Sequence, residues 1–321
     1  MNTSLRTKLG TAAVALSLLA LTACGAGEPG KADPTKSPDA GTEATTVSIT
    51  HAQGTTDVPV NPETVYVFDL GVLDSMGALD ITADGVPEAV YPESLAQYEG
   101  DEFTKIGSMK EPDFEAIAAG EPDLIIISGR TASAYEELSK IATTIDLSVD
   151  QADPLNSFQD QAANLGLIFD REEEVAEKLD AIEGQIAATK AKGEDAGSGL
   201  IILTSGGELT AYGPGSRFAL IHDELGLAPA AEVKHEGAHG EAISFEFIKE
   251  ANPDFLFVVD RDSAMGTAGD AASAVLDNEL VASTKAAQND KIVYLDASGW
   301  YMVGYGLNNL PAMISAVDAV L

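Results

Sequence analysis

Two segments of this 321-residue chain share one pattern, in which a helix-like stretch leads to a strand and then to an arginine. Residues 114–130 read FEAIAAGEPDLIIISGR, and residues 245–261 read FEFIKEANPDFLFVVDR. Strand–helix alternation of this kind predicts parallel sheets with helices on both faces. The repeat therefore predicts an α/β protein with two similar lobes, each with an arginine after a corresponding strand.

Five short apolar runs are expected to form buried strands, because they are rich in β-branched residues and lack alternation with polar ones. They are residues 64–70, 123–128, 199–205, 254–260 and 291–296. Helices are expected at 113–120, 134–142 and 243–251. In open α/β sheets, ligands bind outside the carboxyl ends of the strands. Arg130 and Arg261 fall at such ends, so a ligand site is expected there.

A long amphipathic helix is predicted between the two halves, over residues 170–195, with a charged face opposite an apolar stripe. The stripe consists of Val175, Leu179, Ile182 and Ile186. The predicted organisation is an N-terminal lobe, a linking helix and a C-terminal lobe. Their bounds are 46–164, 165–196 and 197–321. Arg171, at the acidic start of the helix, is expected to be a solvated surface residue.

The first 45 residues carry export signals rather than a folded element. Residues 1–23 combine a short basic stretch with an apolar run too short for a stable membrane span, which is typical of a signal peptide. They lead into LTAC, which resembles a bacterial lipobox ending at Cys24, the single cysteine of the chain. An ordinary secretory signal is the alternative. Residues 24–45 are rich in Gly, Pro, Ala and Thr, and are expected to form a flexible tether from a lipid on Cys24.

The net charge of −34 argues against nucleic acid as a partner and against adsorption to anionic lipid. It also makes the arginines informative, since only four follow the predicted signal peptide. They are Arg130, Arg171, Arg217 and Arg261.

Two of the four histidines, His235 and His239, have the spacing of a helical zinc site. Gly237 and Gly240 argue against a helix there, so this spacing has no scaffold. The residues then leave either a site with one histidine or a flexible polar loop.

Several stretches together resemble the iron–siderophore substrate-binding proteins of ABC transporters, which are class III (cluster A) periplasmic binding proteins. The similar stretches follow in order over residues 49–79, 105–130, 213–227, 239–261 and 291–302. The resemblance covers roughly residues 46–321 and is greatest to lipoproteins that bind ferric catecholates. It implies two Rossmann-like lobes joined by one long helix, with the ligand in a cleft between the lobes and no catalysis.

The resemblance also implies a ligand set. Three arginines would line the cleft and bind the siderophore, namely Arg130, Arg217 and Arg261. Guanidinium groups suit an anionic ferric catecholate because they are always charged and donate in a fork. His239 and Tyr301 would complete the iron coordination of a tetradentate siderophore, whereas a hexadentate one would not need them. Tyr305 is a nearby substitute for Tyr301.

Family members dock on their permease through one acidic residue in each lobe. The candidates are Glu111 and Glu115 in the first lobe and Glu246 in the second. The resemblance therefore implies a monomer, lipid-anchored to the outer face of the cell membrane through Cys24, that delivers Fe(III)-siderophore to ABC permease subunits. No permanently bound cofactor is expected.

Two alternatives remain. The same fold could bind ferric hydroxamate, haem or cobalamin, although three arginines are more than a less negative hydroxamate complex needs. A secreted enzyme is the alternative from another class. The sequence holds no G-x-S-x-G motif and no phosphate-binding loop, because TSGGE and YGPGS lack the lysine and the spacing. Trp300 is expected to pack at the cleft rim, and His51 and His222 to be structural or exposed.

Overall fold

The computed structural model describes residues 45–234 and 240–321. The predicted signal peptide, Cys24 and the tether up to residue 44 lie outside the described residues, as do His235 and His239. Among the helices of the described ranges, none is long and apolar enough to cross a membrane.

The first sheet has five parallel strands in the order β5-β4-β3-β6-β7. They are β3 (Val65–Val67), β4 (Gly85–Val86), β5 (Thr104–Lys105), β6 (Leu124–Ile127) and β7 (Thr144–Asp146). An antiparallel hairpin of β1 (Thr46–His51) and β2 (Gly54–Pro59) precedes it. Its helices are α1 (Leu70–Ala78), α2 (Phe114–Ala119), α3 (Tyr135–Leu138) and the 3₁₀ helices Glu93–Glu99 and Ala132–Ala134.

The second sheet follows the order β11-β9-β8-β12-β13, with β10 beside β8. Its strands are β8 (Ser198–Ser205), β9 (Glu208–Tyr212), β10 (Ala228–Pro229), β11 (Glu241–Ile243), β12 (Phe255–Asp260) and β13 (Ile292–Tyr294). The accompanying helices are α6 (Phe245–Ala251), α7 (Arg261–Ala264), α8 (Ala272–Val275), α9 (Glu279–Ala282), α10 (Lys285–Gln288) and the π-helical turns Leu220–Glu224 and Gly299–Val303.

This second sheet corrects the prediction of parallel sheets, because β9 runs antiparallel to β8 and β11 antiparallel to β9. The cause is the turn between β8 and β9. Gly206 and Gly207 both have positive φ, at 57° and 82°. A two-residue turn with positive φ at both positions reverses a strand into a hairpin.

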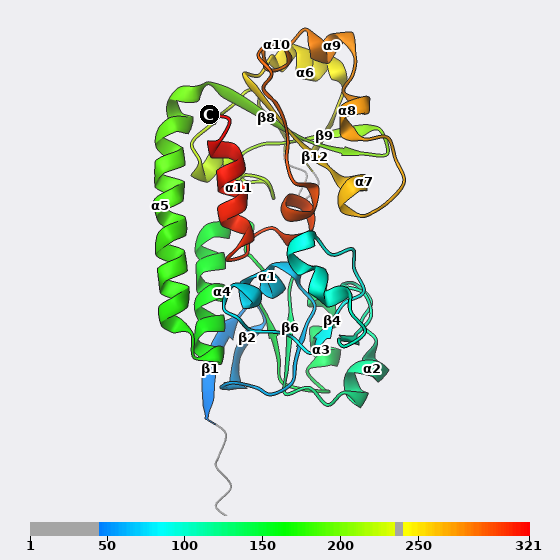
Figure 1. The fold of residues 1–321 in the computed structure, drawn as a ribbon, viewed down its shortest axis with the longest axis vertical. Helices are drawn as coiled ribbons and strands as arrows, with labels where there is room; N and C mark the ends of the chain where they lie inside the picture. The colour runs from blue at the N-terminus through cyan, green and yellow to red at the C-terminus, as the bar shows by residue number, and fades with distance from the viewer. Residues whose placement is uncertain (1–44, 235–239) are drawn as a thin grey trace, which may run out of the picture. The chain divides into compact units, whose positions relative to one another are not determined.

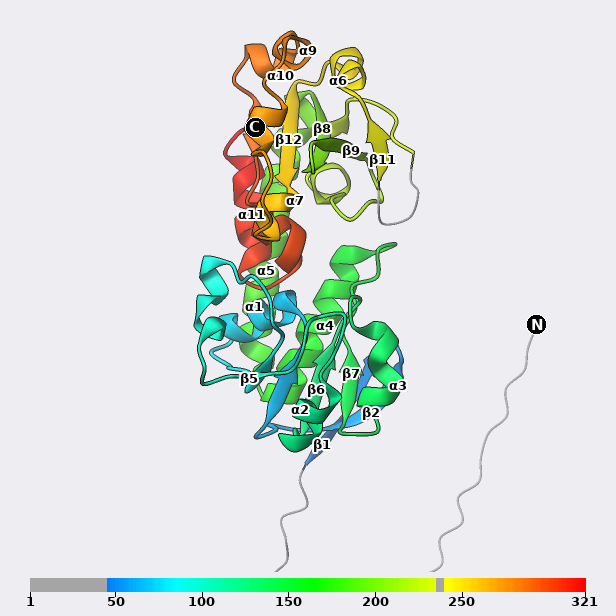
Figure 2. The ribbon, with the colours of Figure 1, turned by 90° about the vertical axis from the view of Figure 1, so that its right-hand side faces the viewer.

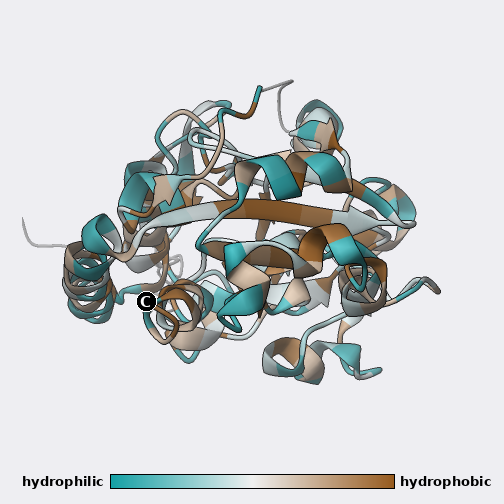
Figure 3. Cartoon of the chain, turned by 90° about the horizontal axis from the view of Figure 1, so that it is seen from above, coloured by the Kyte–Doolittle hydropathy of each residue, from teal (hydrophilic) through white to brown (hydrophobic). Residues whose placement is uncertain are grey.

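Four of the five runs predicted to form buried strands do so, as β3, β6, β8 and β12. The fifth run forms β13, but its residues are partly buried or exposed, because β13 lies at the edge of its sheet and pairs only with β12. Every residue of β6 is buried, as is every residue of β8 except its two end positions and every residue of β12 except Asp260. Seen from above, a long central strand is hydrophobic in its middle part, while helices around it carry hydrophilic residues (Figure 3). The helix predicted over 134–142 is shorter, because α3 ends at Leu138.

Three longer helices pack together: α4 (Pro154–Phe169), α5 (Glu172–Ala196) and α11 (Asn309–Asp318). Figures 1 and 2 show α5 extending alongside both groups of strands, and it contacts α4 and α11. The linking helix predicted over 165–196 differs at its start, since residues up to Phe169 belong to α4. Asp170 adopts a left-handed φ of 59° and ends α4, so the predicted segment contains the end of one helix and the whole of α5.

A buried carboxylate ties the start of α11 to α1. Asp74, 2 % exposed, accepts hydrogen bonds at its Oδ2 from the backbone N–H groups of Asn308 (2.8 Å) and Asn309 (2.9 Å). Burial raises the pKa of Asp74, and these two hydrogen bonds oppose that rise. Asp74 therefore fixes the end of the segment that leads from the 299–303 turn into α11, at a cost in desolvation.

Replacing Asp74 with Asn is expected to change how stability depends on pH. The folded protein holds the Asp74 proton more tightly than the unfolded chain does. Its contribution to stability is therefore largest below the ordinary value of 3.8 and is lost as pH rises through the raised pKa. Asp74→Asn keeps an acceptor and cannot ionise. Urea unfolding at several pH values should show the native protein losing stability relative to the variant as pH rises from 3.8; a constant difference would contradict the assignment.

Candidate functional site

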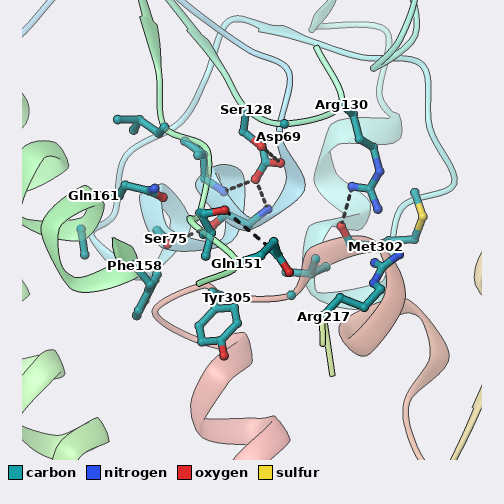
Figure 4. Close-up of a pocket in the computed structure, with 18 of the residues that line it drawn as sticks. Asp69, Ser75, Ser128, Arg130, Gln151, Phe158, Gln161, Arg217, Met302 and Tyr305 are labelled. Carbon is teal, nitrogen blue, oxygen red and sulfur yellow. Dashed lines mark hydrogen bonds between the residues drawn. The ribbon is translucent and has the colours of Figure 1, made fainter. Parts of the chain in front are cut away.

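A cavity of about 380 Å³ opens where strand ends of the first sheet meet α4 and the chain around Tyr301 (Figure 4). Its polar lining side chains are Asp69, Ser75, Ser128, Gln151 and Gln161, together with Arg130 and Arg217. Phe158, Trp300 and Tyr305 add aromatic surface. Asp69 and Ser128 follow β3 and β6 at the carboxyl edge of the sheet, and the Ser128 hydroxyl donates to Asp69 at 2.6 Å.

The guanidinium groups of Arg130 and Arg217 meet at one backbone carbonyl. Arg130 donates from Nη2 to the oxygen of Tyr301 at 2.9 Å and from Nη1 to that of Met302 at 3.2 Å. Arg217 donates from Nη2 to the same Tyr301 oxygen at 2.8 Å. Figure 4 shows the two side chains directed at this turn from different segments. Two cations are thus held beside each other by a neutral acceptor.

Arg261 reaches the same residue through its side chain. Its Nε donates to the Tyr301 hydroxyl at 2.9 Å, and its Nη1 donates to Ser205 at 3.2 Å. The Tyr301 ring also lies 4.5 Å from the guanidinium carbon of Arg217, within the range of a cation–π contact. All three predicted arginines therefore surround Tyr301.

This crowding of positive charge perturbs two groups. Burial lowers the pKa of Arg217, and the neighbouring charge of Arg130 lowers it further. For Tyr301, burial alone would raise the pKa, but the hydrogen bond from Arg261 and the charges of the three arginines outweigh burial and lower it. Among the described residues, Arg261 forms one long ion pair, with its Nη1 4.0 Å from Oδ1 of Asp262. Neither Arg130 nor Arg217 forms an ion pair within those residues. The arrangement favours an anion.

A second cavity, of about 490 Å³, shares Arg130, Tyr301 and Met302 with the first. Its other lining residues are Glu88, Ala89, Val90, Ser108, Met109, Lys110, Arg261 and Met265. Most of these residues come from loops of the first sheet, whereas Arg261 and Met265 belong to α7 and its C-cap. Tyr301 and Arg130 thus lie between the two cavities and line both of them.

Close packing against α1 positions the 299–303 turn. A Cβ added to Gly71 would lie 2.5 Å from the Tyr305 carbonyl oxygen and 2.8 Å from that of Val303. The turn also ends at Gly304, whose φ is 67°. The backbone that carries Tyr301 therefore depends on a glycine of the first lobe.

Gly71→Ala is expected to destabilise the fold by about 1–3 kcal/mol, the usual cost of overpacking. Gly77, in the same helix, is the matched control, because an added Cβ there meets nothing within 4 Å. Gly77→Ala should be neutral or stabilising by up to about 1 kcal/mol, since alanine favours helix. Thermal unfolding of both variants measures the difference. Equal effects at the two positions would contradict the close approach at Gly71.

The other predicted residues fall in different places. His239 lies outside the described residues, so its distance from Tyr301 stays a prediction. Tyr305 lines the first cavity, packs 5.8 Å from the Phe158 ring, and has its pKa raised by burial. Trp300 is more buried than the predicted rim position, at 3 % exposed, yet it lines the same cavity.

Residues expected to be structural or exposed show those features. His222 is buried and bonds through Nδ1 to the Leu227 carbonyl at 2.8 Å. His51 contacts Thr56 at 2.9 Å. Arg171 is 41 % exposed and lies 3.4 Å from Glu174. The docking candidates Glu111, Glu115 and Glu246 are exposed, the last in the first turn of α6.

Sequence reasoning missed the polar residues of the first cavity and the methionines of the second. The rule that found Arg130 applies equally to Asp69 and Ser128, which also follow strands at the carboxyl edge. Gln151, Gln161 and the methionines carry no comparable signal. Within the described residues, no group of three or more His, Cys, Asp or Glu side chains is placed to hold a metal ion.

The comparison that decides the family is a match of residues 65–298 to the model described as periplasmic binding protein. The chain belongs to the periplasmic binding protein family. This binding protein is 40 % identical to the petrobactin-binding protein YclQ of Bacillus subtilis, over 92 % of this chain and 93 % of that one. The crystal structure of YclQ superposes with a TM-score of 0.82 and covers 86 % of this chain and 98 % of that one.

Two further solved structures are similar. The catecholate-siderophore binding protein VctP of Vibrio cholerae is 34 % identical, with a TM-score of 0.81, covering 86 % of this chain and all (100 %) of that one. The iron uptake ABC transporter substrate-binding protein PiuA of Streptococcus pneumoniae is 35 % identical, with the same TM-score of 0.81, covering 87 % and 100 %. These likenesses establish the two-lobed fold of this family for the chain.

Proposed function

We propose that this periplasmic binding protein captures a ferric siderophore of the catecholate type outside the cytoplasm and delivers it to an ABC permease. The observation that carries the proposal is the convergence of Arg130, Arg217 and Arg261 on Tyr301, between two cavities. Ferric catecholates are anionic and offer oxygen atoms to forked donors. The siderophore and iron-uptake names of YclQ, VctP and PiuA support the same ligand class.

Each residue has a role in this proposal. The free N–H groups of the three arginines bind the catecholate oxygens, and the carbonyls of Tyr301 and Met302 hold two of the guanidinium groups in place beforehand. Binding a preorganised site loses less conformational entropy. Tyr301 supplies a phenolate to iron when the siderophore provides four oxygens, and His239 supplies an imidazole. Tyr305 is less suited, since its raised pKa opposes ionisation.

Ferric hydroxamate, haem and cobalamin are the alternative cargoes in the same fold. A panel titration separates them, because Trp300 is the single tryptophan and lines the first cavity. Ferric bis- and tris-catecholates should quench its fluorescence saturably, whereas a ferric trihydroxamate, haem and cobalamin should not at the same concentrations. Tightest binding of any of these last three would overturn the proposal. His239→Ala tests ligation directly: affinity for a tetradentate ferric catecholate should fall, and an unchanged value would rule that ligand out.

The proposal includes the sequence-derived location and partners. Residues 1–23 direct export, Cys24 carries the lipid, and residues 24–45 tether lobes bounded at 46–164 and 197–321 to the outer face of the cell membrane. Glu111 or Glu115 and Glu246, exposed on the surface, dock on the permease. The protein acts as a monomer, without catalysis. Cys24→Ala should shift it from the membrane fraction to the soluble one, and continued membrane retention would contradict the anchor.

A further inference from the structure

The second cavity has an unusual lining for a chain with six methionines, because three of them meet there. They are Met109, Met265 and Met302, from three separate segments. Val90, 48 % exposed, and Ala89 add further apolar surface. Charged side chains also border the cavity: Glu88, Lys110, Arg130 and Arg261. Most of the lining between these charges is therefore soft and apolar.

The backbones of the three methionines are fixed next to the arginines. The Met302 carbonyl accepts from Arg130 at 3.2 Å, and the Met265 N–H donates to the Arg261 carbonyl at 3.0 Å. The Met109 carbonyl accepts from the Thr131 hydroxyl at 2.5 Å, one residue after Arg130. The three methionines, whose residues line the cavity, are therefore anchored by their backbones beside Arg130 and Arg261.

This combination suits one kind of group, a flat aromatic ring with anionic oxygens along one edge. Polarisable sulfur makes favourable contacts with aromatic rings, of about 0.3–1.5 kcal/mol each. The ring oxygens would meet Arg130 and Arg261 while the ring lies against the methionines. The volume of about 490 Å³ is ample, since an apolar cavity of about 150 Å³ holds benzene.

We propose that the second cavity is a subsite for one aryl arm of the chelator, with Met109 and Met265 as specificity-determining residues. The proposal rests on the proposed function, because a ferric chelate bound at the three arginines places its arms on either side of Tyr301. The first cavity, lined by amide and hydroxyl side chains, then receives the more polar part of the ligand. A ligand whose arms lack rings would lose the contacts of the second cavity and keep those of the arginines.

The methionine methyl groups report this directly. With protein labelled by carbon-13 at the methionine methyls, a diamagnetic gallium(III) complex of a linear bis-catecholate is added and binding is checked by Trp300 fluorescence. Ring currents should shift the Met109 and Met265 signals, assigned by single Met→Gln variants. Met76, buried in α1 and lining neither cavity, is the internal control for the methyl signals. Met313, which lines the first cavity, reports on the ligand there. Binding that shifts Met313 and leaves Met109 and Met265 unmoved would overturn the subsite.

Affinities give a second test. The double variant Met109→Gln, Met265→Gln should bind the ferric bis-catecholate about 5- to 10-fold more weakly and ferric dicitrate, an anionic complex without rings, unchanged. Leu167→Gln, at an exposed apolar residue that lines neither cavity, is the matched control and should affect neither ligand. An equal loss for both ligands would show a structural role and overturn the subsite. Failure of the native protein to bind any ferric catecholate would overturn the proposed function, and this subsite with it.

Discussion

Replacing Arg217 with Ala is expected to weaken binding of a ferric bis-catecholate by about 10- to 100-fold. A hydrogen bond to a charged group contributes about 1.5–3 kcal/mol, and each 1.4 kcal/mol is a factor of ten in affinity. Burial and the positive charge of Arg130 both lower the pKa of Arg217, which means that they disfavour its charged form. An anionic ligand beside Arg217 would stabilise that charged form. Titration of Trp300 fluorescence measures the change.

Arg171→Ala is the matched control for this variant. Arg171 is exposed beside Glu174 and lines neither cavity, so its removal takes away one positive charge of the mature chain without touching the site. Its affinity should stay within about twofold of native, since exposed ion pairs are worth little. Arg217→Lys distinguishes charge from geometry, because lysine keeps the charge and loses the fork. Equal affinities for the Arg217→Ala and Arg171→Ala variants would refute the role of Arg217.

The sequence predicted Arg130 and Arg261 because each follows the carboxyl end of a strand. Arg130 comes shortly after β6 and Arg261 directly after β12, and these strands hold equivalent places in their sheets: β6 lies between β3 and β7, and β12 between β8 and β13. The carboxyl end of a strand can be predicted from the position at which an apolar run ends. Arg217 follows no strand end of this kind, and only the resemblance to a known family pointed to it.

Contacts made by backbone groups could not be predicted in the same way. The carbonyl of Tyr301 accepts from Arg130 and Arg217 because a π-helical turn, packed on Gly71, presents it to both. Such a turn leaves no periodic signal in the sequence. The second cavity could not be predicted either, since Met109 and Met265 are far apart in the chain and line one cavity only in the folded protein.

The distribution of charge gives a physical reason for clustering the arginines. With a net charge of −34, the protein field repels an anion at long range. The cleft offsets that repulsion locally, where low dielectric strengthens each interaction and salt screens it less than at the surface. Arg130 and Arg217, held on the neutral carbonyl of Tyr301 rather than by carboxylates, keep their charge available for the ligand.

Tyr301→Phe is expected to weaken binding of tetradentate ferric catecholates by about 10- to 100-fold and to leave hexadentate ones nearly unchanged. Only a complex with open iron positions gains a phenolate ligand. Ligation requires loss of the phenol proton, so the native affinity should rise with pH up to the pKa of Tyr301 and then level off. The arginines lower that pKa below 10, which moves the plateau toward neutral pH. In the variant, this part of the pH dependence should vanish, as should any phenolate-to-iron charge-transfer absorption.

Tyr305→Phe provides the matched control, because it removes the other phenol of the first cavity. Its burial raises the pKa of Tyr305 and leaves the group protonated, so the variant should retain both the affinity and the pH dependence of the native protein. The reverse outcome, with loss of affinity and of the absorption band in Tyr305→Phe but not in Tyr301→Phe, would move the iron ligand to Tyr305. Equal, pH-independent losses for tetradentate and hexadentate complexes in Tyr301→Phe would instead mean that Tyr301 acts only by holding Arg261 through its hydroxyl, at 2.9 Å from Nε.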